Sequence, residues 1–204
     1  ARGIFWERLG GPANWTTMAA KKAEFEALGG TFVEHATATE IYPGVWLTGP
    51  VPRTHPERNW GNPMSRGASG NQVRSPDGPV EDNIPESMSL VINTTKGLVV
   101  VSGCGHAGMI NTLEYAQSVV QPAPIHAAIG GFHLLHGSDA HLAWTAEKLV
   151  DLELENFVGA HCTGIEPVYR FRELVGLGRA NSVVGATGAS FSLEAGIDPS
   201  TLAR

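Results

Sequence analysis

Cysteine and basic residues are both scarce in this sequence of 204 residues. Two cysteines, Cys104 and Cys162, are too few for the disulfide framework of a small secreted domain, so we expect a reduced, cytoplasmic chain. Lys and Arg number 14 against 20 Asp and Glu, which gives a net charge of -6. A nucleic-acid-binding protein normally presents a basic face, and we therefore expect no nucleic-acid partner.

Long apolar runs are missing as well. No stretch of 18 consecutive apolar residues occurs, so we expect no membrane-spanning helix and no membrane partner. Residues 1–15 contain neither an initiator methionine nor the apolar core of a signal peptide. Hydrophobic residues nevertheless make up 42% of the chain, enough for a packed core. A chain of this length is expected to form a single domain, here 1–204.

The hydrophobic pattern predicts an α/β (α+β) fold. Apolar residues at helical spacing predict helices at 15–28, 107–120, 138–156 and 166–178. Runs rich in β-formers predict strands at 31–35, 39–49, 124–135, 156–164 and 182–193, and a hairpin at 87–103. Strands alternate with helices in the second half, which is typical of a sheet covered by helices.

Between residues 50 and 86 the periodicity disappears, and we expect a long loop inserted within the domain. Loops of this length are either functional or mobile, and both interpretations stay open. Trp60 and the charged residues around it would suit a loop that closes over a binding site. Glu81 and Asp82 are expected as a solvated acidic pair, with a structural role as the less favoured alternative.

Three histidines share one local context. His106, His133 and His161 each follow a short apolar strand and lie close to glycine. They are separated by 27 and 28 residues, about one strand–helix unit each. Equivalent ends of neighbouring strands meet at one edge of a sheet, so the three imidazoles are expected to converge. Neutral imidazole is a common ligand of zinc, and glycine permits a close approach of the backbone.

The roles of these histidines follow from that pattern. His106 and His161 are predicted metal ligands, and His133 is either a third ligand or a catalytic acid or base that faces the substrate. Cys104 and Cys162 lie within two residues of the predicted ligands. Small buried residues beside the site are the favoured interpretation of these cysteines, and thiolate ligation is the alternative. The remaining histidines are expected at the surface, behind the ligands or packed in the fold: His35, His55, His126, His136 and His141.

Three motifs together resemble one branch of the metallo-β-lactamase superfamily: Gly-Cys-Gly-His-Ala-Gly at 103–108, Gly-Gly-Phe-His-Leu at 130–134 and His-Cys-Thr-Gly at 161–164. That branch is similar to the dihydropterin-type aminobenzene-phosphate synthases and their hydrolase-like relatives. The segment "IYPGVWLTGPVPR" (41–53) also looks like theirs, and the resemblance covers residues 15–193. It implies an αββα sandwich with metal at one edge of its two sheets, of which this chain forms the larger, C-terminal part.

The resemblance also assigns residues. It makes His106 the ligand from the middle of the fold and His161 the late ligand, and it puts His133 where the superfamily usually has a bridging aspartate. The superfamily's His-x-His-x-Asp-His motif, which supplies most ligands of the first metal, does not occur in the 204 residues. We therefore expect that motif on a companion polypeptide or a missing segment, and a degenerate stand-alone domain is the alternative.

The function implied by the resemblance is that of a metal-dependent hydrolase. One or two ions, zinc by default and manganese or iron as alternatives, would activate water to attack a lactone, an ester or a phosphorylated small molecule. Two other functions stay open: a non-catalytic binding or assembly module, and a pterin-pathway synthase. A homo-oligomer is also compatible with the sequence.

Overall fold

The computed structural model of the protein describes residues 5–9, 18–57 and 72–200. Its helices are α1 (Met18–Ala27), α2 (Met109–Val119), α3 (Asp139–Asp151), α4 (Ile165–Val175) and the short 3-10 helix η3 (His161–Thr163). Its strands are β1 (Glu7–Leu9), β2 (Thr39–Tyr42), β3 (Val45–Leu47), β4 (Gln72–Ser75), β5 (Gly78–Glu81), β6 (Ser89–Thr94), β7 (Gly97–Ser102), β8 (Ile125–Gly130), β9 (Asn156–Gly159), β10 (Ser182–Val184), β11 (Ser190–Ser192) and β12 (Gly196–Asp198). None of the helices in these ranges is long and apolar enough to span a bilayer.

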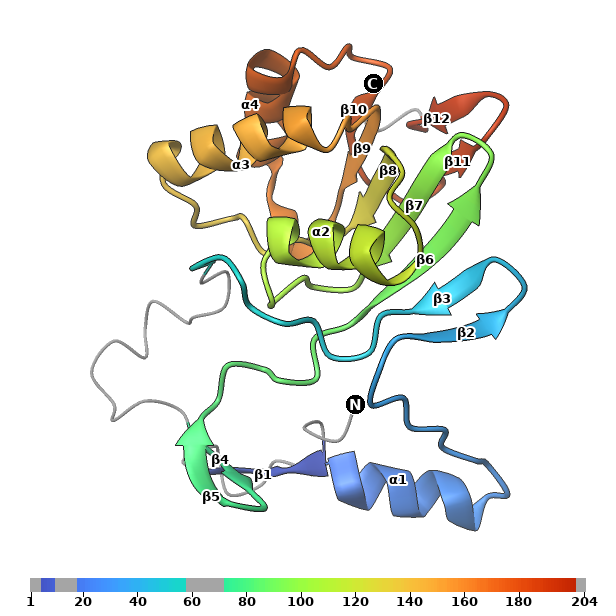
Figure 1. The fold of residues 1–204 in the computed structure, drawn as a ribbon, viewed down its shortest axis with the longest axis vertical. Helices are drawn as coiled ribbons and strands as arrows, with labels where there is room; N and C mark the ends of the chain where they lie inside the picture. Colours follow the sequence, from blue (N-terminus) through green and yellow to red (C-terminus); the bar gives the residue numbers. More distant parts are fainter. Residues whose placement is uncertain (1–4, 10–17, 58–71, 201–204) are drawn as a thin grey trace.

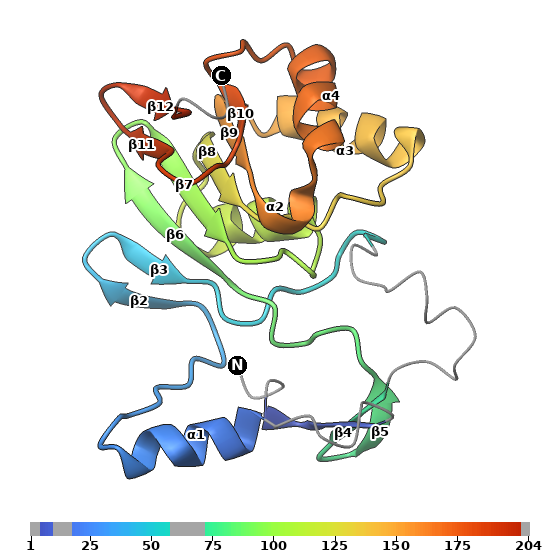
Figure 2. The same cartoon turned by 180° about the vertical axis from the view of Figure 1, so that it is seen from behind.

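A seven-stranded mixed sheet forms the centre of the fold, in the order β10-β9-β8-β7-β6-β3-β2. Strands β7, β8, β9 and β10 run parallel, whereas β6, β3 and β2 pair antiparallel to their neighbours. Helices α2, α3 and α4 lie together beside this sheet, while α1 and the small sheet β1-β4-β5 lie at the other end of the molecule (Figures 1 and 2). The predicted α/β class is confirmed.

The core explains why the central strands are so apolar. Val100 of β7, Ala128 of β8 and Phe157 of β9 are fully buried and belong to one cluster with the inner side chains of the helices. Strands covered by helices read as continuous apolar runs rather than as alternating patterns. The helix termini are set locally: Ser138 caps α3 by accepting a hydrogen bond from the backbone N–H of His141, and Gly176 ends α4 in a left-handed conformation.

Two expectations about local structure are wrong. Residues 31–35 form no strand. Phe32 instead packs edge-to-face on Phe25 of α1, with ring centroids 5.3 Å apart. The segment 50–86 is not structureless, because β4 and β5 form a hairpin within it. Turn chemistry closes the tip of this hairpin: the Ser75 hydroxyl accepts a hydrogen bond from the N–H of Asp77 and donates one to the carbonyl of Gly78. Trp60 lies outside the described residues.

The three loops that follow β7, β8 and β9 are bound together by hydrogen bonds. We refer to residues 103–108, 131–135 and 160–164 as the strand-end loops. The carbonyl of Gly130 accepts hydrogen bonds from the N–H of Ala160 and from the hydroxyl of Thr163, at 2.8 and 3.0 Å. The N–H of Gly131 donates to the carbonyl of Ser102 at 3.1 Å. The loops that carry the three predicted histidines are therefore fixed relative to one another.

Gly130→Ala should destabilise the fold, since a Cβ at this position would collide with the carbonyl oxygen of Ser102. Its φ of 118° is also one that residues with side chains rarely adopt. Backbone strain of this kind costs about 1–3 kcal/mol before the collision is counted. Urea unfolding would measure the loss. Gly103→Ala is the matched control, because its Cβ would have no neighbour within 4 Å. Equal free energies of unfolding for the two variants would contradict this account.

Candidate metal centre

The structure brings two of the three predicted histidines into contact. The rings of His106 and His133 are 4.8 Å apart between centroids, in an edge-to-face arrangement at 61°. They come from the strand-end loops after β7 and β8, which are adjacent parallel strands. Nδ1 of His133 is buried and has no hydrogen-bond partner. A buried imidazole nitrogen without a partner is open to a metal ion or to a substrate group.

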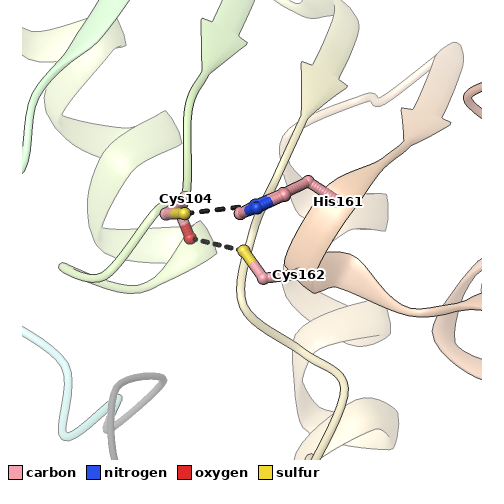
Figure 3. Close-up of side chains that lie close together, drawn as sticks. All are labelled: Cys104, His161 and Cys162. Atoms are coloured by element: carbon pink, nitrogen blue, oxygen red, sulfur yellow. Dashed lines mark hydrogen bonds between the residues drawn. The ribbon is translucent and has the colours of Figure 1, made fainter.

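The third histidine lies on the next strand-end loop and faces sulfur. Nδ1 of His161 is 3.2 Å from Sγ of Cys104, and Sγ of Cys162 donates a hydrogen bond to the carbonyl of Cys104 at 3.3 Å (Figure 3). The ligand atoms of these three residues all lie within 4.8 Å of one another. The cysteines are free and half-buried rather than buried as expected.

The electrostatic surroundings keep the imidazoles neutral. Burial, then the neighbouring His133, Arg53 and His161, lower the pKa of His106 to about 4, although Asp82 acts in the opposite direction. Burial also lowers the pKa of His133, with smaller contributions from His136 and His161. Neutral imidazole is the form that binds metal, so both rings are available as ligands at neutral pH.

Two of the histidines also have unusual backbones. His133 has a φ of 49° and His161 a φ of 51°. Residues with side chains adopt this left-handed conformation rarely and at a cost, and such residues cluster at functional sites. The strand-end loops hold both residues in this conformation, because Thr163 accepts a hydrogen bond from the N–H of Phe132, beside His133, and bonds the carbonyl of Gly130.

The donor atoms present fit a metal ion. Imidazole nitrogen and cysteine sulfur are both preferred ligands of zinc. Three such protein ligands, of one kind or mixed, leave the fourth position of a catalytic zinc site for water. The unpartnered Nδ1 of His133 adds a buried nitrogen with no other role in the described structure. The ligand roles of His106, His133 and His161, and the catalytic role of His133, stay predictions.

Asp82 and Arg53 lie close enough to His106 to change its pKa. Asp82 is buried and accepts a hydrogen bond from the N–H of Ile84 at 3.1 Å, so the expected solvated pair is wrong for Asp82 and correct only for the exposed Glu81. Arg53 donates to the carbonyl oxygens of Glu57 and Asn83. Arg53 belongs to the segment "IYPGVWLTGPVPR", and that resemblance was the available signal.

Glu57 is the most deeply buried carboxylate near the site, with 2% of its surface exposed. Its two oxygens accept hydrogen bonds from the N–H groups of Ile110 and Asn111, at 3.2 and 2.8 Å. Helix α2 has Gly108 at its N-cap and therefore no side-chain cap of its own. Glu57 supplies the cap from a distant segment, and a side chain at Gly108 would collide with it.

The same segment is attached to α2 a second time. Oδ1 of Asn111 accepts hydrogen bonds from the backbone N–H groups of Thr54 and His55, at 2.9 and 2.7 Å. Nε2 of His55 lies 2.8 Å from a carboxylate oxygen of Glu114. Residues 51–57 are thus fixed against the helix that begins three residues after His106.

Substitution of Glu57 should change how the free energy of unfolding depends on pH, because this carboxyl group is buried. Burial raises the pKa of Glu57 above 4.5, although hydrogen bonds from Asn111, Ile110 and Met109 oppose the shift. A raised pKa in the folded state gives a contribution to stability that is complete below pH 4.5 and is lost as the pH rises through the folded pKa. The free energy of unfolding of the wild type should therefore decrease relative to that of Glu57→Gln between pH 4.5 and neutrality, as measured by urea unfolding.

Glu57→Ala serves as the control, because it removes the helix cap as well as the charge. It should cost about 1 kcal/mol or more at every pH in this range. A difference between the wild type and Glu57→Gln that does not change with pH would contradict the assignment.

Comparison with known proteins finds enzymes that are similar to this chain. No protein-family model matches the chain. It is 28% identical to the 7,8-dihydropterin-6-methyl-4-(beta-D-ribofuranosyl)-aminobenzene-5'-phosphate synthase of Methanocaldococcus jannaschii. The alignment spans 152 residues, which cover 74% of this chain and 50% of that protein. It also resembles the crystal structure of a metal-dependent hydrolase of the β-lactamase superfamily, with a TM-score of 0.59 and 30% identity over 72% of this chain and 54% of the other.

The chain thus spans about half the length of each relative. Both relatives are enzymes, and the structural similarity implies metal binding without identifying the metal. A curated relative and a solved structure therefore confirm that this chain has a β-lactamase-superfamily fold and resembles the branch of the dihydropterin-type aminobenzene-phosphate synthases.

Proposed function

We propose that this chain forms part of a metal-dependent hydrolase that acts on a small molecule. The observation that carries the proposal is the contact between His106 and His133, which the ends of β7 and β8 present side by side. His161 on the third strand-end loop is close enough to lower the pKa of both. The similarity to a metal-dependent hydrolase of the β-lactamase superfamily supports the same reaction type.

His106, His133 and His161 would hold the metal, with zinc as the default and manganese or iron as alternatives. A bound ion of this kind lowers the pKa of a coordinated water and polarises a carbonyl or phosphoryl oxygen, which is the chemistry needed to cleave a lactone, an ester or a phosphorylated compound. Burial lowers the pKa of His106 and His133 and so keeps their imidazoles neutral. Hydrogen bonds between the strand-end loops fix the segments that carry all three histidines. In the alternative role, His133 would act as a hydrogen-bond or proton donor to the substrate, and its Nδ1 has no competing hydrogen-bond partner in the described structure.

A complete centre for one or two ions needs more ligands than these three. The His-x-His-x-Asp-His motif is not among the 204 residues, and we propose that it comes from a companion polypeptide or a further segment. An aspartate from that motif would orient the attacking water.

A second candidate function is a pterin-pathway synthase, favoured by the name of the curated relative. It uses the same imidazoles but joins two molecules instead of adding water. A non-catalytic module is the third candidate. It would bind a ligand or partner through the same face and show no turnover in the presence of the missing motif.

His106→Ala and His161→Ala should each reduce bound metal and hydrolysis together, because each removes one ligand. The expected loss of metal affinity exceeds about 100-fold, since even residues that only support a ligand are worth 10- to 100-fold. Elemental analysis and a panel of lactones, aryl esters and phosphate esters would measure both, with the chain purified alone and with a polypeptide that carries the His-x-His-x-Asp-His motif.

His35→Ala is the control, because His35 lies between α1 and β2 and away from the strand-end loops in the sequence. It should retain metal and activity. Full metal content in both ligand variants would refute the ligand assignment. Metal loss without any turnover, in the presence of the motif, would favour the non-catalytic module.

A further inference from the structure

We propose that Cys104, His161 and Cys162 form a sulfur-rich site for one thiophilic divalent cation, of the class of Zn²⁺ or Cd²⁺. The site lies beside the His106–His133 pair and shares only His161 with the proposed hydrolytic centre. It goes beyond the proposed function, because it requires neither the missing motif nor any turnover.

The geometry of the three donors is close to that of a metal site. Metal–sulfur bonds of about 2.3 Å and metal–nitrogen bonds of about 2.0 Å in a tetrahedron separate the ligand atoms by about 3.5–3.8 Å. Sγ of Cys104 and Nδ1 of His161 are 3.2 Å apart, and no pair among the three donors exceeds 4.8 Å. Small side-chain rotations are enough to place all three around one ion, with a fourth position left for water or another ligand.

The scaffold holds the donors from two sides. Cys104 comes from the strand-end loop after β7, whereas His161 and Cys162 begin η3 after β9 (Figure 3). The carbonyl of Cys162 accepts a hydrogen bond from the N–H of Leu135 at 3.2 Å, and the N–H of His133 hydrogen-bonds its sulfur. Gly131 leaves room for that sulfur, since a Cβ there would lie 3.0 Å from it.

The site is also open to solvent. His161 is exposed and both cysteines are half-buried, so an ion can reach the donors without unfolding of the loops. As each metal–sulfur bond forms, the thiol releases its proton to solvent, and the hydrogen bond from Cys162 to the carbonyl of Cys104 is exchanged for the bond to the metal.

Ligand softness separates this site from the neighbouring histidine pair. Thiolates favour soft and borderline ions, whereas imidazoles alone also accept a wider set of transition metals. The two nitrogens of an imidazole are distinct, and His161 turns Nδ1 to Cys104. Binding on the sulfur side therefore uses Nδ1 and does not require the imidazole of His106 or of His133.

The test is a titration of the full, reduced chain with Co²⁺ and Cd²⁺, followed by the sulfur-to-metal charge-transfer absorption in the near ultraviolet. We expect one equivalent to produce the band in the wild type. Cys104→Ser and Cys162→Ser should weaken it, and the double variant should abolish it. His106→Ala is the matched control: it removes a neighbouring imidazole and should leave the band unchanged.

Protection from alkylation provides a second readout that needs no cysteine variant. Saturating Cd²⁺ should slow the reaction of Cys104 and Cys162 with iodoacetamide in both the wild type and His106→Ala, as followed by intact mass. A folded wild type that binds metal without the band and without protection overturns the proposal, and so does a band that survives in the double variant.

The outcomes also separate this site from the proposed function. Metal that is bound without a thiolate band and is lost in His106→Ala would leave the hydrolytic centre standing and refute the sulfur site. A thiolate band in a chain that stays inactive with the missing motif supplied would support the sulfur site and count against the hydrolase.

Discussion

The carbonyl oxygen of Gly130 accepts two hydrogen bonds, and the site depends on them. One comes from the backbone N–H of Ala160 and the other from the hydroxyl of Thr163, which in turn accepts from the N–H of Phe132. Because these bonds join the loop after β8 to the loop after β9, they fix the separation between His133 and His161. The hydrogen bond from the N–H of Gly131 to the carbonyl of Ser102 likewise fixes the loop after β8 against the end of β7. The backbones approach so closely here that a Cβ at 130 or 131 would collide with the carbonyl oxygen of Ser102 or of Gly103. This is the physical reason for the Gly-Gly pair in the second motif.

A second constraint comes from a segment distant in the sequence. Residues 51–57 lie against the N-terminus of α2, where Glu57 accepts hydrogen bonds from two helix N–H groups that Gly108 cannot satisfy. A buried carboxylate is costly, but its charge is favourable beside the positive end of a helix dipole. The turn that carries His106 is therefore held from both ends, by β7 on one side and by the capped helix on the other.

The sequence predicts the central fold well, because each buried strand is a short apolar run bounded by glycine and each long helix has the 3.6-residue period. It also predicts which strand ends carry the imidazoles. It fails where tertiary partners decide the outcome. Residues 31–35 have strand-forming side chains, but Phe32 packs on α1 instead. Asp82 looks like half of a solvated pair and is buried beside His106. Glu57 belongs to no recognisable sequence motif, since it caps a helix that begins more than fifty residues later.

Burial lowers the pKa of an imidazole and raises the pKa of a thiol, and both shifts favour the neutral form of the group. Desolvation disfavours charge, so it lowers the pKa of His106 to about 4 and raises the pKa of Cys162 to about 11, with the neighbouring Cys104 adding to the latter shift. Both groups are consequently neutral near pH 7. For an imidazole the neutral form is already the ligand, whereas a thiol must still lose its proton to the incoming metal. The imidazoles of His106 and His133 are therefore already in the form that would bind the proposed ion. An ion at the proposed sulfur site would have to displace the thiol protons, which favours soft cations with a high affinity for thiolate.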